Sequence, residues 1–302
     1  MSTMRSADLG RLVALAIIWS LSFVFIRVVV APLGPVWTAT LRMLVAGVAL
    51  CAFFALVGFH ADVRRHWRAY LIVGLVNSAA PFLLFAWAAQ TLPASYLVVL
   101  NAASPMFSAV LGALWLDESL DTVKVAGLVA GAAGVAMVSG AGPLAPSPAV
   151  IAAVVASLAA ALCYALAGMW LKRRGGGLPP KAIAGWSQLF AGVAILPFAL
   201  PFPIPGPITA QVAANVAALG LLCSSVAYLL YFRLIRDIGP TRAMTVTFLM
   251  PALGMLWGVV FLGETVTPAM VGGAALVIAG TGAVLRPARV RAPSAARPPR
   301  TV

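Results

Sequence analysis

The chain has 302 residues, of which 63% are hydrophobic and 9% are charged, whereas about a quarter of the residues of an ordinary soluble domain are charged. A single soluble core stops growing near this chain length, so it cannot bury that much apolar surface. The composition excludes a soluble enzyme, a disordered chain and a disulfide-linked secreted module. The net charge of +13 also occurs in nucleic-acid-binding proteins, so the positions of the charges must decide that question.

Ten apolar stretches follow one another along the chain. A transmembrane helix needs about 20 mostly apolar residues to cross about 30 Å of hydrocarbon. The stretches that meet this length, some of them narrowly, are residues 12–30, 36–58, 69–90, 95–116, 123–140, 149–171, 182–200, 210–232, 241–262 and 269–285. We therefore expect an all-α polytopic membrane protein with ten transmembrane helices. The first stretch follows two arginines, as in a signal peptide, but it lacks a convincing cleavage site and is expected to stay attached.

The lysines and arginines predict the orientation of these helices. If the N-terminus lies inside, each of the 20 basic residues falls in a cytoplasmic segment, except Arg27 and Arg42, which lie within spans. The positive-inside rule then places both termini in the cytoplasm. The charge is thus a topology signal, and no nucleic-acid partner is expected. The Arg- and Pro-rich tail, residues 286–302, is predicted to rest on anionic lipid.

An internal repeat relates the two halves of the sequence. At one constant offset Pro105 pairs with Pro251 and Glu118 with Glu264, and two glycines follow each glutamate at matching positions. Each half contains five spans, an odd number, so the second half is inverted relative to the first. The predicted parts are a cytoplasmic tail (1–11), a first repeat (12–140), an outer linker (141–148), an inverted second repeat (149–285) and a basic cytoplasmic tail (286–302). Inverted repeats are typical of secondary transporters, whose substrate site lies near the membrane midplane.

These features resemble the drug/metabolite transporter superfamily, and within it the EamA-type bacterial exporters. The resemblance covers about residues 10–285 and rests on the five-plus-five helices, the Glu-containing turns, the mid-span prolines, Arg27, Arg42 and the pair Trp19-Ser20. Ser20 replaces the glycine that is common in the family. Within the family the chain is most similar to exporters of aromatic amino acids. The resemblance implies two EamA-like repeats in a bacterial inner membrane, rocking about a central cavity.

The sequence contains no pattern for catalysis, a cofactor or a metal, so we expect a transporter rather than an enzyme. The seven acidic residues fall in tails or turns, and the two histidines lie among arginines in one loop. Cys51, Cys163 and Cys223 lie in apolar runs and form no CxxC or Cys/His cluster. Proton- and sodium-coupled carriers commonly have a carboxylate or histidine in the bilayer interior. Because this chain has none there, the sequence favours facilitated export down a substrate gradient, with ion coupling through other groups as the alternative.

A substrate site is expected near the middle of the spans, where polar side chains need a partner or a water-filled cavity. Aromatic rings can stack on flat apolar substrates, and amides and hydroxyls can orient amino and carboxylate groups. For any single side chain, helix–helix packing is the commoner role. The candidates are Trp19, Asn77, Ser78, Phe82, Phe85, Asn101, Tyr164, Trp186, Gln188, Ser224, Tyr228, Thr245, Phe248 and Trp257.

Three further residues are candidates for a gate or an ion pair. Arg27 and Arg42 are expected at comparable depth in the outer half of the membrane, and Glu264 is the only acid on that side. We predict that at least one arginine pairs with Glu264, or with helix-end carbonyl groups across the repeat boundary, and closes an outer gate. Snorkelling of the arginines to the membrane surface is the competing explanation.

Local signals also predict helix starts and tight helix contacts. Asp121 and Thr267 are candidate N-caps for the last helix of each half. Small-residue faces on these two helices predict close packing; they are formed by Gly127, Gly131, Gly134, Gly272, Gly273 and Gly280.

The sequence as a whole predicts an inner-membrane secondary transporter that works by alternating access. The expected cargo is a small metabolite, with aromatic and other apolar amino acids favoured. The expected partners are this substrate and the lipid bilayer, and both a monomer and a homodimer remain open. A broader drug or metabolite exporter is the nearest alternative. A channel or a membrane-embedded enzyme is the alternative of a different class; a channel would show conductance, and an enzyme would turn over substrate in detergent.

Overall fold

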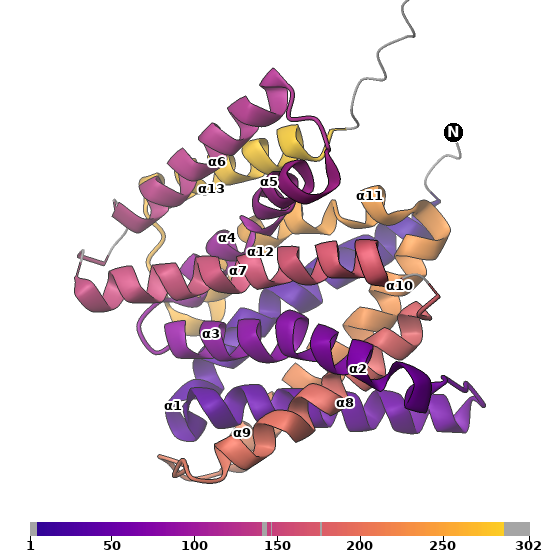
Figure 1. Cartoon of the computed structure of the whole chain (residues 1–302). Helices are drawn as coiled ribbons and strands as arrows, with labels where there is room; N and C mark the ends of the chain where they lie inside the picture. The colour runs from indigo at the N-terminus through magenta and orange to yellow at the C-terminus, as the bar shows by residue number, and fades with distance from the viewer. Residues whose placement is uncertain (1–4, 141–143, 146, 176, 287–302) are drawn as a thin grey trace, which may run out of the picture.

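The computed structural model describes residues 5–140, 144–145, 147–175 and 177–286, and this part of the chain is helical throughout, with no strand (Figure 1). Seven of its helical stretches are long and apolar enough to cross a membrane, and two apolar helices are shorter. This is the architecture of a polytopic membrane protein. The elements are α1 (Ser6–Leu56), α2 (Val63–Gly74), η1 (Leu75–Ala79), α3 (Ala80–Ala88), α4 (Ala94–Asn101), α5 (Ser104–Leu116), α6 (Thr122–Gly140), α7 (Pro148–Arg174), α8 (Pro180–Ala199), α9 (Ala210–Ala217), η2 (Ala218–Val226), α10 (Ala227–Ile238), α11 (Pro240–Ala243), α12 (Val246–Leu262) and α13 (Pro268–Val284).

Helix α1 contains the first two predicted spans. Its 51 residues form one element, but Gly34 has φ 72° and ψ 165°, outside the helical region. A positive φ costs glycine little because it has no Cβ, and Pro32 and Pro35 cannot donate to the helical hydrogen-bond ladder. The chain therefore bends at Gly34, and the two arms of α1 leave the lower left of Figure 1 in different directions. Because α1 begins at Ser6, part of the predicted tail 1–11 is helical; residues 1–4 and most of the predicted tail 286–302 lie outside the described residues.

Several other predicted spans are interrupted near their middle. The predicted span 95–116 forms α4 and α5, which are separated before Pro105 because proline has no N–H to continue the helix. The predicted span 69–90 corresponds to α2, η1 and α3, and the predicted span 210–232 corresponds to α9, η2 and α10. The elements η1 and η2 are π-helical. Because π-helical turns are rare and frequently mark functional sites, these two turns direct attention to the middle of the bundle.

Helices α6 and α13 pack backbone against backbone through glycines (Figure 1). A Cβ on Gly134 would lie 2.5 Å from the carbonyl oxygen of Gly273, and a Cβ on Gly273 would lie 2.7 Å from the carbonyl oxygen of Gly134. The same reciprocal contact joins Gly127 and Gly280. A larger residue would push the two backbones apart, so the predicted tight contact between small-residue faces is confirmed.

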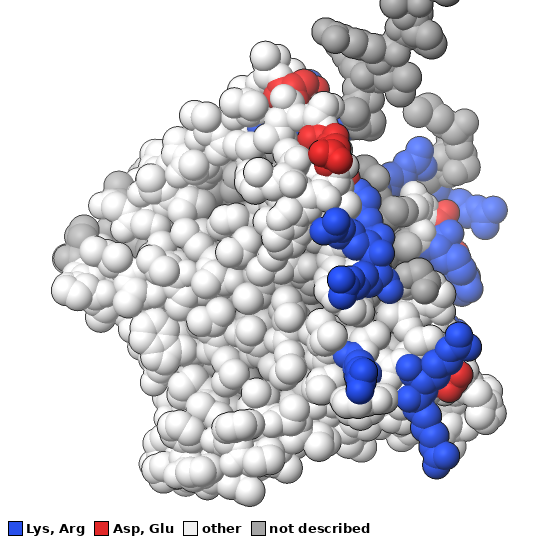
Figure 2. Space-filling view, viewed as in Figure 1, with Lys and Arg blue, Asp and Glu red and all other residues white. Residues whose placement is uncertain are grey.

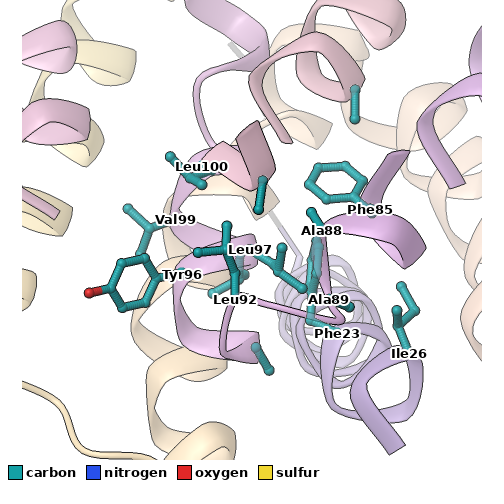
Figure 3. Close-up of a cluster of buried hydrophobic side chains, with 14 of the residues drawn as sticks. Phe23, Ile26, Phe85, Ala88, Ala89, Leu92, Tyr96, Leu97, Val99 and Leu100 are labelled. Carbon is teal, nitrogen blue, oxygen red and sulfur yellow. The ribbon is translucent and has the colours of Figure 1, made fainter. Parts of the chain in front are cut away.

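The largest buried cluster surrounds α4 (Figure 3). Leu97 and Leu100 of α4 are fully buried, and the Phe23 ring of α1 meets the Phe85 ring of α3 edge to face at 5.4 Å between centroids. Helix α4 also packs against α12 and α7. This core fixes α4 in the middle of the bundle and joins helices from both halves of the sequence.

Lysine and arginine side chains gather at one end of the molecule (Figure 2). This basic end is formed by the first turns of α1, α2 and α8 and the last turns of α7 and α10; its exposed cations include Arg64, Arg173, Lys181 and Arg233. The opposite end is formed by the Gly34 bend and the α3–α4, α8–α9 and α12–α13 connections. The flank between the two ends shows no charge in Figure 2, as a surface that faces hydrocarbon requires.

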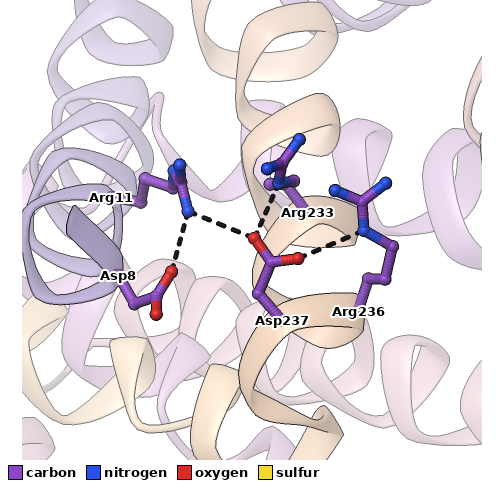
Figure 4. A network of polar contacts seen from close by, with 5 residues as sticks. All are labelled: Asp8, Arg11, Arg233, Arg236 and Asp237. Carbon is purple, nitrogen blue, oxygen red and sulfur yellow. Dashed lines mark hydrogen bonds and ion pairs between the residues drawn. The ribbon is translucent and has the colours of Figure 1, made fainter. Parts of the chain in front are cut away.

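An ion-pair network at the basic end ties the start of α1 to the end of α10 (Figure 4). Arg11 contacts Asp8 at 2.7 Å and Asp237 at 3.1 Å. Asp237 also contacts Arg233 at 2.6 Å and Arg236 at 3.1 Å. The pairs of Asp237 with Arg233 and Arg236 are exposed and add little stability because water screens them. Arg11 links the buried Asp8 of α1 to Asp237 of α10.

Both predicted N-caps are confirmed. The Thr267 hydroxyl accepts a hydrogen bond of 3.3 Å from the N–H of Met270, and α13 begins at the next residue. The Asp121 carboxylate accepts one of 2.9 Å from the N–H of Lys124, and α6 begins at the next residue. These bonds satisfy N–H groups that have no partner within the first helical turn.

Candidate functional site

Arg42 is a cation buried inside the bundle, with 7% of its surface exposed. Its Nε donates a hydrogen bond of 3.1 Å to the hydroxyl of Ser224 in η2, and its guanidinium lies 3.9 Å from the centre of the Phe82 ring in α3. Placing an arginine at the centre of a bilayer costs about 2.5–3.5 kcal/mol on insertion scales, and a cation–π contact returns about 0.5–2 kcal/mol. The hydroxyl and the ring lower this cost but leave the charge unneutralised.

A second set of polar side chains surrounds the hydroxyl of Tyr228, close to Arg42. Asn77 in η1 donates a hydrogen bond of 3.2 Å to this hydroxyl, and Ser78 and Gln188 lie beside it. Both Ser78 and Gln188 are fully buried, yet the Ser78 hydroxyl and both amide atoms of Gln188 make no hydrogen bond of good geometry among the described residues. Buried polar groups are normally satisfied. These polar atoms are therefore available to water or to polar atoms of a bound molecule.

These side chains form one group, which we call the Arg42 cluster: Arg42, Asn77, Ser78, Phe82, Gln188, Ser224 and Tyr228. The two π-helical elements supply much of it, since η1 carries Asn77 and Ser78 and η2 carries Ser224. Close helix contacts hold both elements in place. A Cβ on Gly220 in η2 would lie 2.6 Å from the Cβ of Val45 in α1, and Gly74, just before η1, touches the backbone of α8.

Aromatic rings lie next to two members of the Arg42 cluster, Tyr228 and Phe82. The Trp19 ring lies 6.5 Å from the Tyr228 ring and 5.2 Å from the Tyr231 ring. The Phe85 ring stacks on the Tyr164 ring at 6.4 Å. Such rings provide flat apolar faces for a ligand side chain. Tyr231 was not among the sequence candidates, although its spacing of three residues after Tyr228 places both rings on one helix face, which is the signal that could have identified it.

Three predicted candidates lie away from the Arg42 cluster. Trp186 packs against Phe190 in a cluster near the basic end. The Trp257 indole N–H donates a hydrogen bond of 3.0 Å to the hydroxyl of Ser20, so it joins α12 to α1. The Thr245 hydroxyl donates to a backbone carbonyl at the end of α11. The contacts of these side chains are those of helix packing.

Asn101 and Phe248 are not joined to the Arg42 cluster by a hydrogen bond or ring contact in the described part of the chain. Asn101 is the last residue of α4, and its side-chain oxygen is buried without a hydrogen-bond partner. Phe248 is half-buried near the start of α12. Asn101 thus has the buried, unpartnered oxygen of a polar site residue, although it lies at the end of α4.

The structure pairs neither Arg27 nor Arg42 with Glu264. The Glu264 carboxylate instead accepts hydrogen bonds from the backbone N–H groups of Ala94, at 2.6 Å, and Ser95, at 3.0 Å, at the start of α4. Arg27 donates a hydrogen bond of 2.8 Å to a carbonyl at the end of α3, which lies in its own half of the chain. The physical reason is that helix N-termini offer unsatisfied N–H groups and a positive dipole end to an anion, and helix C-termini offer carbonyls to a cation.

A cavity of about 490 Å³ lies at the basic end among α2, α5 and α7. Its lining combines apolar side chains of α2 with Trp115, Trp170, Arg173 and Arg174. None of its lining residues belongs to the Arg42 cluster. The described residues also contain no group of three or more His, Cys, Asp or Glu side chains placed to hold a metal ion.

Comparison with protein families gives two matches along the chain. The model described as the EamA-like transporter family matches residues 10–140 and again residues 151–286. A solved crystal structure superimposes with a TM-score of 0.66, covering 93% of this chain and 96% of that chain at 19% sequence identity. At that identity the superposition supports the helical fold alone.

Three relatives cover most of this chain. It is 28% identical over 269 residues to a probable terminal-alkyne amino-acid exporter of Streptantibioticus cattleyicolor, covering 89% of this chain and 90% of the relative. It is 26% identical to the uncharacterized transporter YvbV of Bacillus subtilis, covering 87% of each chain. It is 28% identical to the uncharacterized inner membrane transporter YedA of Escherichia coli, covering 85% of this chain and 84% of the relative.

Proposed function

The chain belongs to the EamA-like transporter family, and we propose that it is a bacterial inner-membrane carrier that exports aromatic and other apolar amino acids. The observation that carries this proposal is the Arg42 cluster, a buried polar group flanked by aromatic rings. An amino acid with an apolar side chain needs both surfaces, polar atoms for its charged groups and rings for its side chain. The similarity to a probable amino-acid exporter supports the same class of cargo.

The proposed architecture has ten spans in two inverted repeats. The two arms of α1 count as two spans, and the interrupted helices count as one span each. The family match to each half supports the repeat. So do the contacts between α6 and α13, in which Gly127 meets Gly280 and Gly134 meets Gly273. A two-fold axis produces such reciprocal contacts, because it exchanges the members of each repeated pair.

We infer that the basic end faces the cytoplasm, with both termini on that side, since cytoplasmic loops carry the excess of lysine and arginine. The opposite end then faces the periplasm. There, Glu264 in the α12–α13 connection binds the start of α4, and α4 packs against α12. At the basic end α5 packs mainly against α7 and α13, and α11 packs mainly against α10. These contacts favour an inward-facing state of an alternating-access cycle, closed on the periplasmic side.

The proposed transport step is facilitated movement down the substrate gradient. The cargo enters from the cytoplasm, its side chain lies against the rings of Trp19, Phe85 and Tyr164, and its polar groups meet the Arg42 cluster. Rocking of the two halves then exposes the same site to the periplasm. All seven acidic side chains lie outside the Arg42 cluster, which favours transport without a carboxylate that carries a coupled proton.

Counterflow in proteoliposomes tests this function. Vesicles loaded with unlabelled phenylalanine should accumulate labelled phenylalanine through the purified protein, with a rate that saturates. Asn77→Ala removes the donor to Tyr228 and should lower this uptake about tenfold. Asn215→Ala is the matched control, because Asn215 lies in α9 and its amide bonds only the carbonyl of Gln211. Equal uptake by empty and protein-containing vesicles would overturn the proposal.

Two other outcomes would identify the alternative functions. A flux that rises linearly with concentration, together with electrical conductance, would indicate a channel. Saturable uptake of unrelated drugs as fast as phenylalanine would indicate a broad exporter. In both cases the amino-acid cargo proposed here would be wrong, while membership of the family would stand.

A further inference from the structure

The charge of Arg42 has no anionic partner in the described structure. Its contacts are with the hydroxyl of Ser224 and the ring of Phe82, both neutral. The acidic side chains are engaged elsewhere or exposed: Glu264 binds the start of α4, and Glu118 pairs with Lys172. The remaining acids lie in turns or in the network at the basic end. A buried cation without a counter-ion is costly unless an anion binds it during function.

The guanidinium of Arg42 keeps hydrogen-bond donors that such an anion can use. An arginine has five N–H donors in a planar fork. Only Nε of Arg42 donates a hydrogen bond in the described structure, and the Phe82 ring contacts the guanidinium. The two terminal nitrogens therefore keep their donors for a ligand. Two parallel N–H groups match the two oxygens of a carboxylate, and this bidentate arrangement is stronger than a contact to a neutral group.

The unsatisfied acceptors nearby complete the site for a zwitterion. The Gln188 side-chain oxygen and the Ser78 hydroxyl are fully buried, and neither makes a hydrogen bond of good geometry within the described residues. Both lie beside the Tyr228 hydroxyl. These neutral oxygen atoms can accept hydrogen bonds from an ammonium group, but they offer it no negative charge. The site is therefore strongly selective for an anion and only weakly selective for a cation.

From these contacts we propose that Arg42 binds the carboxylate of the cargo, so that a carboxylate is required for binding and an amino group is not. This inference rests on the proposed function in placing the cargo at the Arg42 cluster. It extends that function by assigning the specificity-determining residue and by predicting the ligand class. Aromatic carboxylates without an amino group should bind, and aromatic amines or amides without a carboxylate should be rejected.

Equilibrium binding to the purified protein in detergent tests the proposal with three ligands of nearly equal shape. The ligands are 3-phenylpropionate, 3-phenylpropanamide and 2-phenylethylamine, measured by titration calorimetry up to millimolar concentration. For the unmodified protein, 3-phenylpropionate should bind at least tenfold more tightly than the amide and the amine. In Arg42→Gln this preference should disappear. In Arg42→Lys, which keeps the charge but loses the planar fork, an intermediate preference should remain.

Arg27→Gln is the matched control, because Arg27 is the other arginine within a span and its hydrogen bond goes to a carbonyl at the end of α3. This variant should keep the full preference for 3-phenylpropionate. Arg42→Gln can fail to fold, which gel filtration would show. In that case, the comparison of the three ligands on the unmodified protein and on Arg42→Lys still tests whether Arg42 binds the carboxylate. Equal binding of carboxylate and amide, no binding of the carboxylate, or a preference that survives in Arg42→Gln would overturn the proposal.

Failure of the proposed function gives a different pattern. If phenylalanine shows no counterflow but 3-phenylpropionate binds in an Arg42-dependent manner, the cargo is wrong and the carboxylate site stands. If phenylalanine is transported but Arg42→Gln transports it normally, the carrier function stands and the carboxylate site is wrong.

Discussion

Glu264 and Ala94 are joined by a hydrogen bond of 2.6 Å from the backbone N–H of Ala94 to the Glu264 carboxylate, although they are 170 positions apart in the chain. A second bond comes from the N–H of Ser95. Glu264 thus caps a helix from the other half of the sequence rather than the helix that follows it. Glu118, its counterpart in the sequence repeat, instead forms an exposed ion pair with Lys172.

The two glutamates should therefore differ in their effect on stability. Loss of a side-chain helix cap costs about 0.5–2 kcal/mol, whereas an exposed ion pair contributes about 0–1 kcal/mol. Glu264→Ala should lower the melting temperature in detergent clearly more than Glu118→Ala does. Equal shifts for both variants would show that the Glu264 cap does not stabilise the folded protein.

Because α6 and α13 are in close contact, adding a single methyl group between them should strongly lower the stability of the protein. Gly134→Ala would place a Cβ 2.5 Å from the carbonyl oxygen of Gly273, and overpacking of this kind costs about 1–3 kcal/mol. Thermal melting should show a lower melting temperature for Gly134→Ala. Gly168→Ala in α7 is the control, because nothing lies within 4 Å of the added Cβ, and it should melt at or above the unmodified protein's temperature. A neutral Gly134→Ala variant would mean that the two helices are further apart.

Cysteine labelling of intact cells checks the orientation. In a variant whose three native cysteines are replaced by alanine, Ala149→Cys lies at the start of α7 at the opposite end, and Arg174→Cys lies at the basic end. Both positions are exposed. A thiol reagent that cannot cross the inner membrane should label Ala149→Cys from the periplasm and should not label Arg174→Cys until the cells are broken. The reverse pattern would place the basic end outside.

The Tyr228 hydroxyl should matter for transport rather than for folding. Tyr228→Phe removes the group that accepts the hydrogen bond from Asn77 and should reduce phenylalanine counterflow several-fold while the protein remains monodisperse. Tyr70→Phe is the matched control, because the Tyr70 hydroxyl is also buried but belongs to a cluster near the basic end. Equal activity of both variants would remove Tyr228 from the proposed site.

Much of the candidate site was accessible to sequence reasoning, since polar residues in the middle of apolar spans are few. Asn77, Ser78, Phe82, Gln188, Ser224 and Tyr228 were identified in this way, and the structure brings them together around Arg42. Arg42 itself was expected to act with Glu264. Spacing along one helix indicates which side chains share a face, but it does not tell which other helix that face meets. Trp186 illustrates this, because the structure places it in a packing cluster near the basic end and not beside Arg42.

The membrane class, the helical content and the family could all be inferred from the sequence, because each depends on composition or on patterns along the chain. Apolar stretches of about 20 residues have to be helical in a bilayer, since every backbone N–H and C=O needs a partner. The helix starts at Asp121 and Thr267 could also be predicted from the sequence. Each capping hydrogen bond joins two residues only three positions apart.

The partners of three charged side chains depend instead on how distant helices pack in three dimensions. Arg27, Arg42 and Glu264 each bind a group that is distant in sequence, and the choice among many polar groups depends on which helix ends and faces meet. The π-helical turns η1 and η2 lie where Gly74 and Gly220 make close contacts with α8 and α1, and the sequence pattern did not indicate them. The charge partners and the π-helical turns depend on contacts between segments that are far apart in the chain. The order of residues along the chain does not show which of these segments meet.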